Sequence, residues 1–207
     1  VDELHDKHKH IYEKMNISYD IYSRTSSSNH AEVVQDFFNS IDKKYIIEKE
    51  EEHYYSEQDD MFLPDRFLTG ECPECGKEAN SDQCEHCGKL LSSKELVNPK
   101  SLLSGATPEL RKSKHIYLDL SKLSSDLDKW IESKKDILKK NVYSEAKKWI
   151  NEGLKARSIT RDMSWGVPVL KDGFEGKVFY VWFDAPIGYM TFIQELGKKW
   201  EDYDVYH

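Results

Sequence analysis

The sequence lacks any long apolar run and any excess of positive charge. No stretch of the 207 residues approaches the roughly 20 apolar residues that a membrane-spanning helix needs, and no secretory leader opens the chain. The 30 Lys and Arg against 38 Asp and Glu give a net charge of -8. This excludes a generally basic nucleic-acid coat protein, but not a local RNA contact. We expect a soluble, cytoplasmic protein without membrane contact.

Cysteine is absent from all but one short window of the chain. The 4 cysteines lie between Cys72 and Cys87, whereas a secreted domain held by disulfides usually spreads its cysteines along the sequence. An initial Met is also missing, and the chain runs from Val1 directly into a charged amphipathic stretch. We interpret the sequence as a fragment of a longer protein, with room for one domain or for one domain and part of another.

Hydrophobic periodicity predicts a mixture of helices and strands. The expected helices are 29–41, 123–131 and 142–154. The expected strands are 45–48 and 115–120. The segment 177–183 is almost entirely apolar, which predicts a strand buried on both faces of a parallel sheet. Asp184 would cap the next helix, and Pro186 would lie in its first turn. A buried strand that leads into a helix is half of a βαβ unit, in which ligands bind beyond the strand's carboxyl end.

The cysteines form two copies of one short motif. Each copy reads C-x2-C-G-K, and 8 residues separate the two pairs. Two residues between thiolates let one tight turn direct both sulfurs at a single ion, and the glycine adopts the positive φ that such a turn needs. The motifs predict one structural Zn²⁺ in a closed tetrahedral site, with the ligands Cys72, Cys75, Cys84 and Cys87. Iron in the same site, paired disulfides and free thiols are the alternatives.

Five segments, taken in order, resemble the methionyl-tRNA synthetase family. They are 61–67, the region 72–89 with both cysteine motifs, 103–108, 159–166 and 180–189. The last segment is the most specific, because it contains Trp-Phe-Asp-Ala-Pro-Ile-Gly-Tyr, whereas Arg-Asp followed by Trp-Gly is more widespread among class I synthetases. The resemblance covers essentially the whole chain.

The resemblance implies an α/β fold, namely part of a Rossmann-type class I synthetase catalytic domain interrupted by an α+β connective-peptide insertion with zinc knuckles. Residues 1–43 would end the first half of the catalytic domain. Residues 44–175 would form the insertion, with the knuckles at 70–90, and 176–207 would begin the second half. Both ATP signatures of the family and its anticodon-binding domain would lie outside this sequence.

The resemblance also implies an activity. The family activates methionine with ATP and Mg²⁺ to methionyl-adenylate and transfers it to tRNA(Met), so the whole enzyme would bind these partners and the fragment alone would be inactive. The methionine side chain would contact Trp182, Ala185, Pro186 and Tyr189. Aromatic neighbours suit a polarizable thioether. Arg161 would lie near the catalytic cleft and face a carboxylate from outside the chain.

Some relatives carry a second cysteine pair where this chain has Ser56 and Asp59, so we expect one zinc and not two. For Trp182 the alternative to a pocket is an ordinary core position in a buried strand. For Arg161 the alternative is a surface ion pair with Asp162. The sequence does not specify an oligomeric state.

Two other interpretations of the whole chain remain open. A class I synthetase for valine, isoleucine, leucine or cysteine would share the sheet and the Trp-Gly segment. Such an enzyme should not combine this zinc insertion with Asp-Ala-Pro-Ile-Gly-Tyr. A free-standing zinc-ribbon module that binds RNA or protein would not need the strand and helix expected at 177–200.

Overall fold

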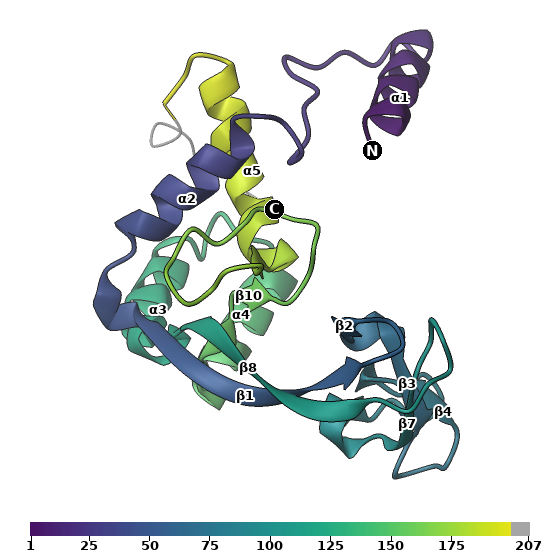
Figure 1. Cartoon of the computed structure of the whole chain (residues 1–207). Helices are drawn as coiled ribbons and strands as arrows, with labels where there is room; N and C mark the ends of the chain where they lie inside the picture. Colours follow the sequence, from purple (N-terminus) through teal and green to yellow (C-terminus); the bar gives the residue numbers. More distant parts are fainter. Residues whose placement is uncertain (200–207) are drawn as a thin grey trace. The chain divides into compact units, whose positions relative to one another are not determined.

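The computed structural model describes residues 1–199 as a mixture of helices and strands (Figure 1). The chain divides into two compact units, which are described separately below. The first comprises residues 1–47 together with residues from 116 onward, and the second, which we call the knuckle unit, comprises residues 48–115. Two long strands, β1 (Ile46–Ser56) and β8 (Glu109–Leu118), each contain one of the boundaries.

The first unit is mainly helical. Its helices are α1 (Asp2–Lys14), α2 (His30–Ser40), α3 (Ser124–Ser133), α4 (Lys140–Glu152) and α5 (Val181–Glu195). The helices expected at 29–41, 123–131 and 142–154 are confirmed as α2, α3 and α4. Asn29 lies at the N-cap of α2, but its side chain makes no capping hydrogen bond. None of these helices is long and apolar enough to cross a membrane, within the part of the chain that the structure describes.

The strand predicted at 177–183 is wrong. The structure has only the two-residue strand β11 (Val178–Phe179) there, and it pairs antiparallel with β10 (Thr160–Arg161) instead of joining a parallel sheet. Periodicity alone does not distinguish a short buried strand from a helix segment. Here the burial decides, because both residues of β11 are buried, whereas the next apolar residues, Val181 and Trp182, are exposed.

The start of α5 also differs from the prediction. Tyr180, in an extended conformation, is the N-cap, and Asp184 lies within the first turn instead of capping it. Pro186 lies inside the helix. Because proline has no N–H, the carbonyl group of Trp182 has no helical donor at that position.

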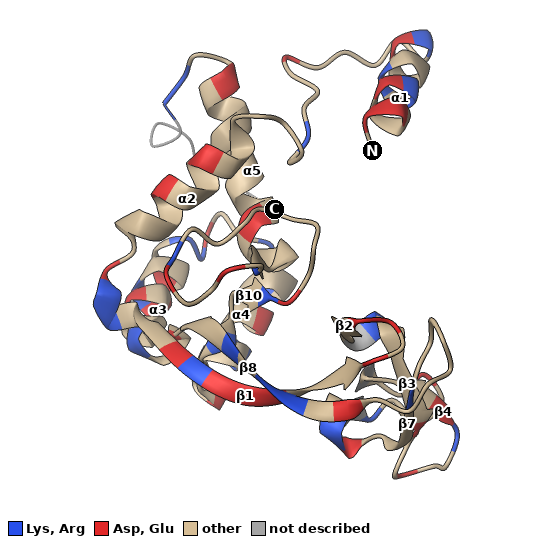
Figure 2. Ribbon diagram, in the orientation of Figure 1, with Lys and Arg blue, Asp and Glu red and all other residues tan. Residues whose placement is uncertain are grey.

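The strands expected at 45–48 and 115–120 are confirmed for residues 46–48 and 115–118, which belong to the longer strands β1 and β8. They are neighbours in a sheet of order β2-β1-β8-β9, whose outer strands are β2 (Met61–Phe62) and β9 (Arg157–Ser158). Figure 2 shows acidic residues along β1 and basic residues along β8. Lys112 Nζ lies 3.4 Å from Glu50, and Lys114 Nζ lies 2.6 Å from Glu48. The exposed acidic segment is thus paired by charge with its neighbouring strand.

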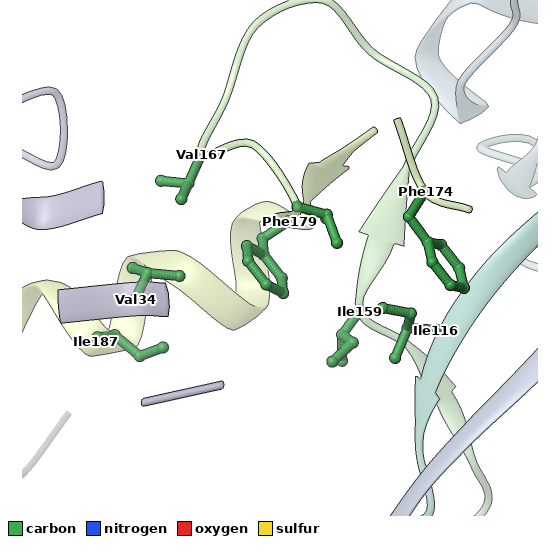
Figure 3. Packing of buried hydrophobic residues seen from close by; sticks show 8 residues of the cluster. Val34, Ile116, Ile159, Val167, Phe174, Phe179 and Ile187 are labelled. Carbon is green, nitrogen blue, oxygen red and sulfur yellow. The ribbon is translucent and has the colours of Figure 1, made fainter. Parts of the chain in front are cut away.

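Helices α2 and α5 pack on a core that also includes residues of β8 and β11. The buried residues are Val34, Ile116, Ile159, Val167, Val169, Phe174, Phe179 and Ile187 (Figure 3). The rings of Phe38 and Phe179 have centroids 5.1 Å apart. Nδ1 of the buried His30, on α2, lies 2.9 Å from Oγ1 of the buried Thr191, on α5. One apolar cluster and one buried hydrogen bond therefore hold α5 against α2.

The knuckle unit is built of short antiparallel strands. One sheet has the order β4-β3-β7, with β3 (Leu68–Glu71), β4 (Glu78–Asn80) and β7 (Val97–Ser101), and a second pairs β5 (Asp82–Gln83) with β6 (Leu90–Leu91). Its buried cluster consists of Leu63, Leu68, Cys72, Ala79, Cys84, Leu91 and Leu96. Two cysteines therefore belong to the core of this unit.

Candidate metal centre and pocket helix

The two cysteine motifs fold as matching turns. In the first, the N–H of Gly76 donates to the carbonyl oxygen of Cys72 and the N–H of Cys72 donates to that of Lys77, with N···O distances of 2.8 Å. The turn at 84–89 repeats both bonds at the same distances. The glycines have φ angles of +69° and +76°, a conformation that glycine adopts without strain. The G in each motif is thus required by the backbone.

These turns bring the four sulfur atoms together. The four Sγ atoms lie within 4.8 Å of one another. The sulfurs of Cys72 and Cys87 are 3.7 Å apart, as are those of Cys75 and Cys84. A disulfide has its sulfurs about 2.0 Å apart, so these pairs are not disulfides. Four sulfurs at about 2.3 Å from a tetrahedral zinc ion would be about 3.8 Å from one another. Both of these distances therefore match the spacing of a tetrahedral zinc site.

The thiols do not share one environment. Cys72 and Cys84 are buried, whereas Cys75 and Cys87 are exposed. The N–H of Cys87, helped by that of His86, lowers the pKa of the Cys84 thiol to about 7. The N–H of Lys89 lowers the pKa of Cys87, but desolvation and the neighbouring thiols raise it to about 11. Four adjacent thiolates repel one another, so the full set ionises together only around a bound cation.

A turn of the same form occurs without cysteine at 101–106. The N–H of Gly105 donates to the carbonyl oxygen of Ser101, and the N–H of Ser101 donates to that of Ala106, both at 2.9 Å. Gly105 has a φ of +75°. The N–H groups of Leu103 and Ser104 lie 3.1 Å and 3.4 Å from Ser101 Oγ. The backbone is that of a cysteine knuckle, with serine at both ligand positions.

A second cysteine-free turn is centred on the carboxylate of Asp59. The N–H of Asp59 donates to Ser56 Oγ at 3.3 Å, and the next residue, Asp60, has a φ of +50°. Asp59 Oδ2 accepts hydrogen bonds from Ser56 Oγ at 2.5 Å and from Ser104 Oγ at 2.7 Å. The hydroxyls of Ser56, Ser101 and Ser104 hold the pKa of Asp59 below its usual value. We call Ser56, Asp59, Ser101 and Ser104 the oxygen cluster.

The residues predicted to contact methionine lie on one face of α5. Their spacing along the helix is i, i+3, i+4 and i+7, which places them on one side: Trp182, Ala185, Pro186 and Tyr189. Trp182 is 69% exposed and Tyr189 36% exposed. The opposite side of the helix carries its buried residues, Ile187, Gly188 and Thr191. A core position for Trp182 is therefore wrong within this structure. We call the four-residue surface the pocket face.

Gly188 allows a close contact behind the pocket face. A Cβ atom at this position would lie 3.0 Å from Cγ2 of Thr25 and 3.3 Å from the ring of Phe192. Contacts of 3.0 to 3.4 Å are tighter than nine in ten real Cβ contacts, so a side chain here would require its neighbours to shift by a few tenths of an ångström. The segment before α2 therefore packs directly against α5 and fixes the side of the helix that faces outward.

Arg161 lies in β10 and is half-buried. Its Cζ atom lies 3.9 Å from the centre of the Tyr180 ring, and its Nη1 donates to the carbonyl oxygen of Thr160 at 2.8 Å. The neighbouring Asp162 forms an ion pair with Lys177, in which both side chains are largely buried. Arg161 thus lies beside the residue that begins α5, on the chain segment next to the pocket face.

Asp184 is a half-buried carboxylate in the first turn of α5. Burial raises the pKa of its carboxyl group to about 6, against a smaller opposing effect from the N–H of Ala185. Its environment therefore differs from that of Asp59, which is surrounded by hydroxyl donors.

A family model described as tRNA synthetases class I (M) matches residues 1–207. The chain belongs to this family. The Methionine--tRNA ligase of Borrelia duttonii is 46% identical over 205 residues, which are 98% of this chain and 28% of that protein. That of Bacteroides fragilis is 47% identical over 204 residues, or 97% of this chain and 30% of that protein. The chain therefore spans less than a third of the length of these relatives.

Solved structures agree with the family in fold. The methionyl-tRNA synthetase of Mycobacterium tuberculosis, in complex with methionyl-adenylate, is 21% identical with a TM-score of 0.57, covering 90% of this chain and 32% of that one. Its apo form is 20% identical with a TM-score of 0.59, covering 96% of this chain and 37% of that one. This class I synthetase segment therefore has the class I synthetase fold, with mixed helix and sheet.

Sequence reasoning missed two features of this synthetase segment. It named Ser56 and Asp59 only as replacements for cysteine and overlooked Ser101 and Ser104, although the pattern Ser-x2-Ser-Gly has the spacing of the cysteine motifs. It also overlooked Tyr180 as a partner of Arg161. No sequence signal marks that contact, because it depends on the pairing of β10 with β11.

Proposed function

We propose that the chain is the central segment of a methionine–tRNA ligase, which activates methionine with ATP to methionyl-adenylate and transfers it to tRNA(Met). The observation that carries this proposal is the pocket face of α5, found in a chain that belongs to the class I (M) family. The names of the relatives support the same enzyme. A synthetase for another amino acid is not favoured, and a free-standing zinc ribbon does not fit a match over the whole chain.

The proposal includes the layout of the parent enzyme. Residues 1–43 and 176–207 would belong to a Rossmann-type catalytic domain, and 44–175 would be its connective-peptide insertion. The compact knuckle unit, 48–115, lies inside that insertion, whereas residues from 116 to 175 group with the first unit. A cytoplasmic location and a need for Mg²⁺ in the parent enzyme belong to the same proposal.

The four cysteines would hold one Zn²⁺, and the S···S distance of 3.7 Å supports this assignment. Cysteine in all four positions leaves no position open for a substrate. The ion would therefore fix the two turns of the knuckle unit and take no part in the chemistry. Loss of the metal should loosen the knuckle unit more than the helices of the first unit, because structural zinc binding is coupled to folding.

Within the first unit, the pocket face would bind the methionine side chain. Trp182 and Tyr189 offer aromatic surfaces to the thioether, and Ala185 leaves space between them. Activation is the attack of the methionine carboxylate on the α-phosphate of ATP, and it requires positioning and charge stabilisation more than a side-chain base. Arg161 would supply positive charge near that reaction. No residue of this chain is needed as a covalent nucleophile.

The test uses the full-length parent enzyme. In Trp182→Ala, methionine-dependent ATP–pyrophosphate exchange should fall by roughly 10–200-fold in kcat/KM, because losing such a contact costs about 1–3 kcal/mol. The KM for ATP should change little. Trp130→Ala is a matched control, because Trp130 is also an exposed helical tryptophan, at 49%. The helical spacing of Trp130 with Leu123, Leu127 and Ile131 predicts a core position for it, and that prediction is wrong. If Trp182→Ala and Trp130→Ala have the same kinetics, the assignment of Trp182 to a methionine pocket is wrong.

A further inference from the structure

Arg161 lies in β10, and Tyr180 directly follows β11, the strand that pairs with β10. In the register of β10 with β11, Arg161 is opposite Val178, and Tyr180 follows two residues later. Diagonal positions of this kind lie on the same face of an antiparallel pair and reach each other through long side chains. The N–H of Tyr180 also donates to the carbonyl oxygen of Ile159 at 2.9 Å. The backbone therefore fixes the ring beneath the arginine.

Two contacts orient the guanidinium group. The Tyr180 ring lies 3.9 Å from Cζ, well within the range of a cation–π contact. The carbonyl oxygen of Thr160 accepts from Nη1 at 2.8 Å. A flat guanidinium that stacks on a ring has its plane set by that ring, so its donors have fixed directions. Lysine could not be held in this way, because its charge is a single point on a flexible chain.

The same tyrosine also begins the pocket helix. Its carbonyl oxygen accepts from the N–H groups of Phe183 at 2.8 Å and Asp184 at 3.1 Å, in the first turn of α5. One residue therefore touches Arg161 with its ring and the start of α5 with its backbone. Any displacement of that residue changes the arrangement of the arginine relative to the pocket face.

We propose that Tyr180 is a positioning residue, whose ring holds the Arg161 guanidinium in the orientation that methionine activation requires. The anionic groups recognised would be the methionine carboxylate or the phosphate that it attacks. The inference rests on the proposed function, in which Arg161 acts near the reacting groups. Tyr180 itself touches no substrate in this account and acts through Arg161.

The experiment measures methionine-dependent ATP–pyrophosphate exchange in the full-length parent enzyme. Tyr180→Phe keeps the ring and should retain kcat within about twofold, whereas Tyr180→Met keeps the bulk without the ring and should lower kcat by roughly 3–30-fold. The KM for methionine should change less than kcat, because the pocket face is retained. Arg161→Lys should also lower kcat, because the ammonium group does not take the stacked geometry.

The decisive comparison is a double-mutant cycle. If Tyr180 acts through Arg161, adding Tyr180→Met to Arg161→Ala should cause no further loss of kcat. Losses that multiply would overturn the inference, as would full activity of Tyr180→Met or of Arg161→Ala. If Tyr180→Met does not fold, Arg161→Lys decides, and wild-type kcat in that variant refutes the proposal. Failure of the proposed function is seen separately, as a wild-type parent without methionine-dependent exchange.

Discussion

The knuckle unit contains a sulfur cluster and an oxygen cluster, and one form of backbone turn occurs in both: twice in the sulfur cluster and once, at 101–106, in the oxygen cluster. The turns at 72–77, 84–89 and 101–106 share a donor–acceptor pattern with N···O distances of 2.8 to 2.9 Å. Each has a glycine at a positive φ in the same place. The clusters differ in the chemical groups that they contain. The sulfur cluster has four like groups, whereas the oxygen cluster has one carboxylate that accepts from hydroxyl donors.

The difference shows what the backbone decides and what the side chains decide. The turn itself needs no metal, because Gly105 and Ser101 form it with oxygen side chains. Four thiolates require a cation, since they repel one another without it. A carboxylate surrounded by hydroxyls has its partners already, and such charge-assisted hydrogen bonds are strong. We therefore expect metal dependence in one cluster and none in the other.

The largest expected effect is the loss of the sulfur centre. Cys84→Ser replaces a buried ligand, so zinc in the purified chain should fall from one per chain to less than half. Residues 48–115 should become sensitive to protease, whereas the helical circular dichroism signal of the first unit should largely remain. His86→Ala is the control, because His86 is exposed and lies between ligands. Stoichiometric zinc in Cys84→Ser would contradict the four-ligand assignment.

The next largest effect is expected when substitutions convert the oxygen cluster into a sulfur cluster. Because the turn at 101–106 has the knuckle backbone and Ser104 already contacts Asp59, a variant with Ser56, Asp59, Ser101 and Ser104 all changed to Cys should bind a second zinc ion. Elemental analysis should then give two zinc ions per chain. A folded variant that still binds one would show that the turns at 56–60 and 101–106 do not face each other as four ligands must.

A smaller effect should follow from removing the central charge. Asp59→Asn weakens the hydrogen bonds from Ser56 and Ser104, so the chain should melt at a lower temperature with its zinc content unchanged. Ser104→Ala removes one donor and should lower the melting temperature less. Loss of zinc in Asp59→Asn would mean that the two clusters are not independent.

The smallest effect concerns a carboxylate without hydroxyl donors. The pKa of Asp184 is raised from 3.8 to about 6 in the folded chain. The folded state therefore binds the proton more tightly, so Asp184 favours folding at low pH and this contribution is lost as pH rises from about 4 to about 6. Asp184→Asn should remove that decline in thermal stability, whereas the exposed Asp172→Asn should keep it. Parallel pH profiles of Asp184→Asn and the wild type would contradict the assignment.

Spacing along the sequence predicted the parts that one short segment determines. The C-x2-C-G-K motifs indicated the sulfur cluster, since all the atoms of one knuckle come from neighbouring residues. The helices α2, α3 and α4 follow from their own periodicity. The apolar segment 177–183 was misassigned, because the change from strand to helix at Tyr180 depends on pairing with β10 and on burial.

Contacts between distant segments were not predictable in the same way. Ser56 and Ser104 reach one carboxylate from turns far apart in the sequence, and serine is too common for its spacing alone to identify a site. The contact between Arg161 and Tyr180 needs the register of two strands. The pocket face was predicted by resemblance, but its outward orientation depends on the packing of Gly188 and Thr191 against the segment around α2.

The metal content of the wild-type chain tests the comparison most directly. Freshly purified protein, freed of loosely bound ions by gel filtration, should contain one zinc ion per chain, because only the sulfur cluster requires a cation. A ratio near zero would show that the four cysteines are not a metal centre. A ratio near two would show that the oxygen cluster also binds a metal, and the distinction between the two clusters would fail.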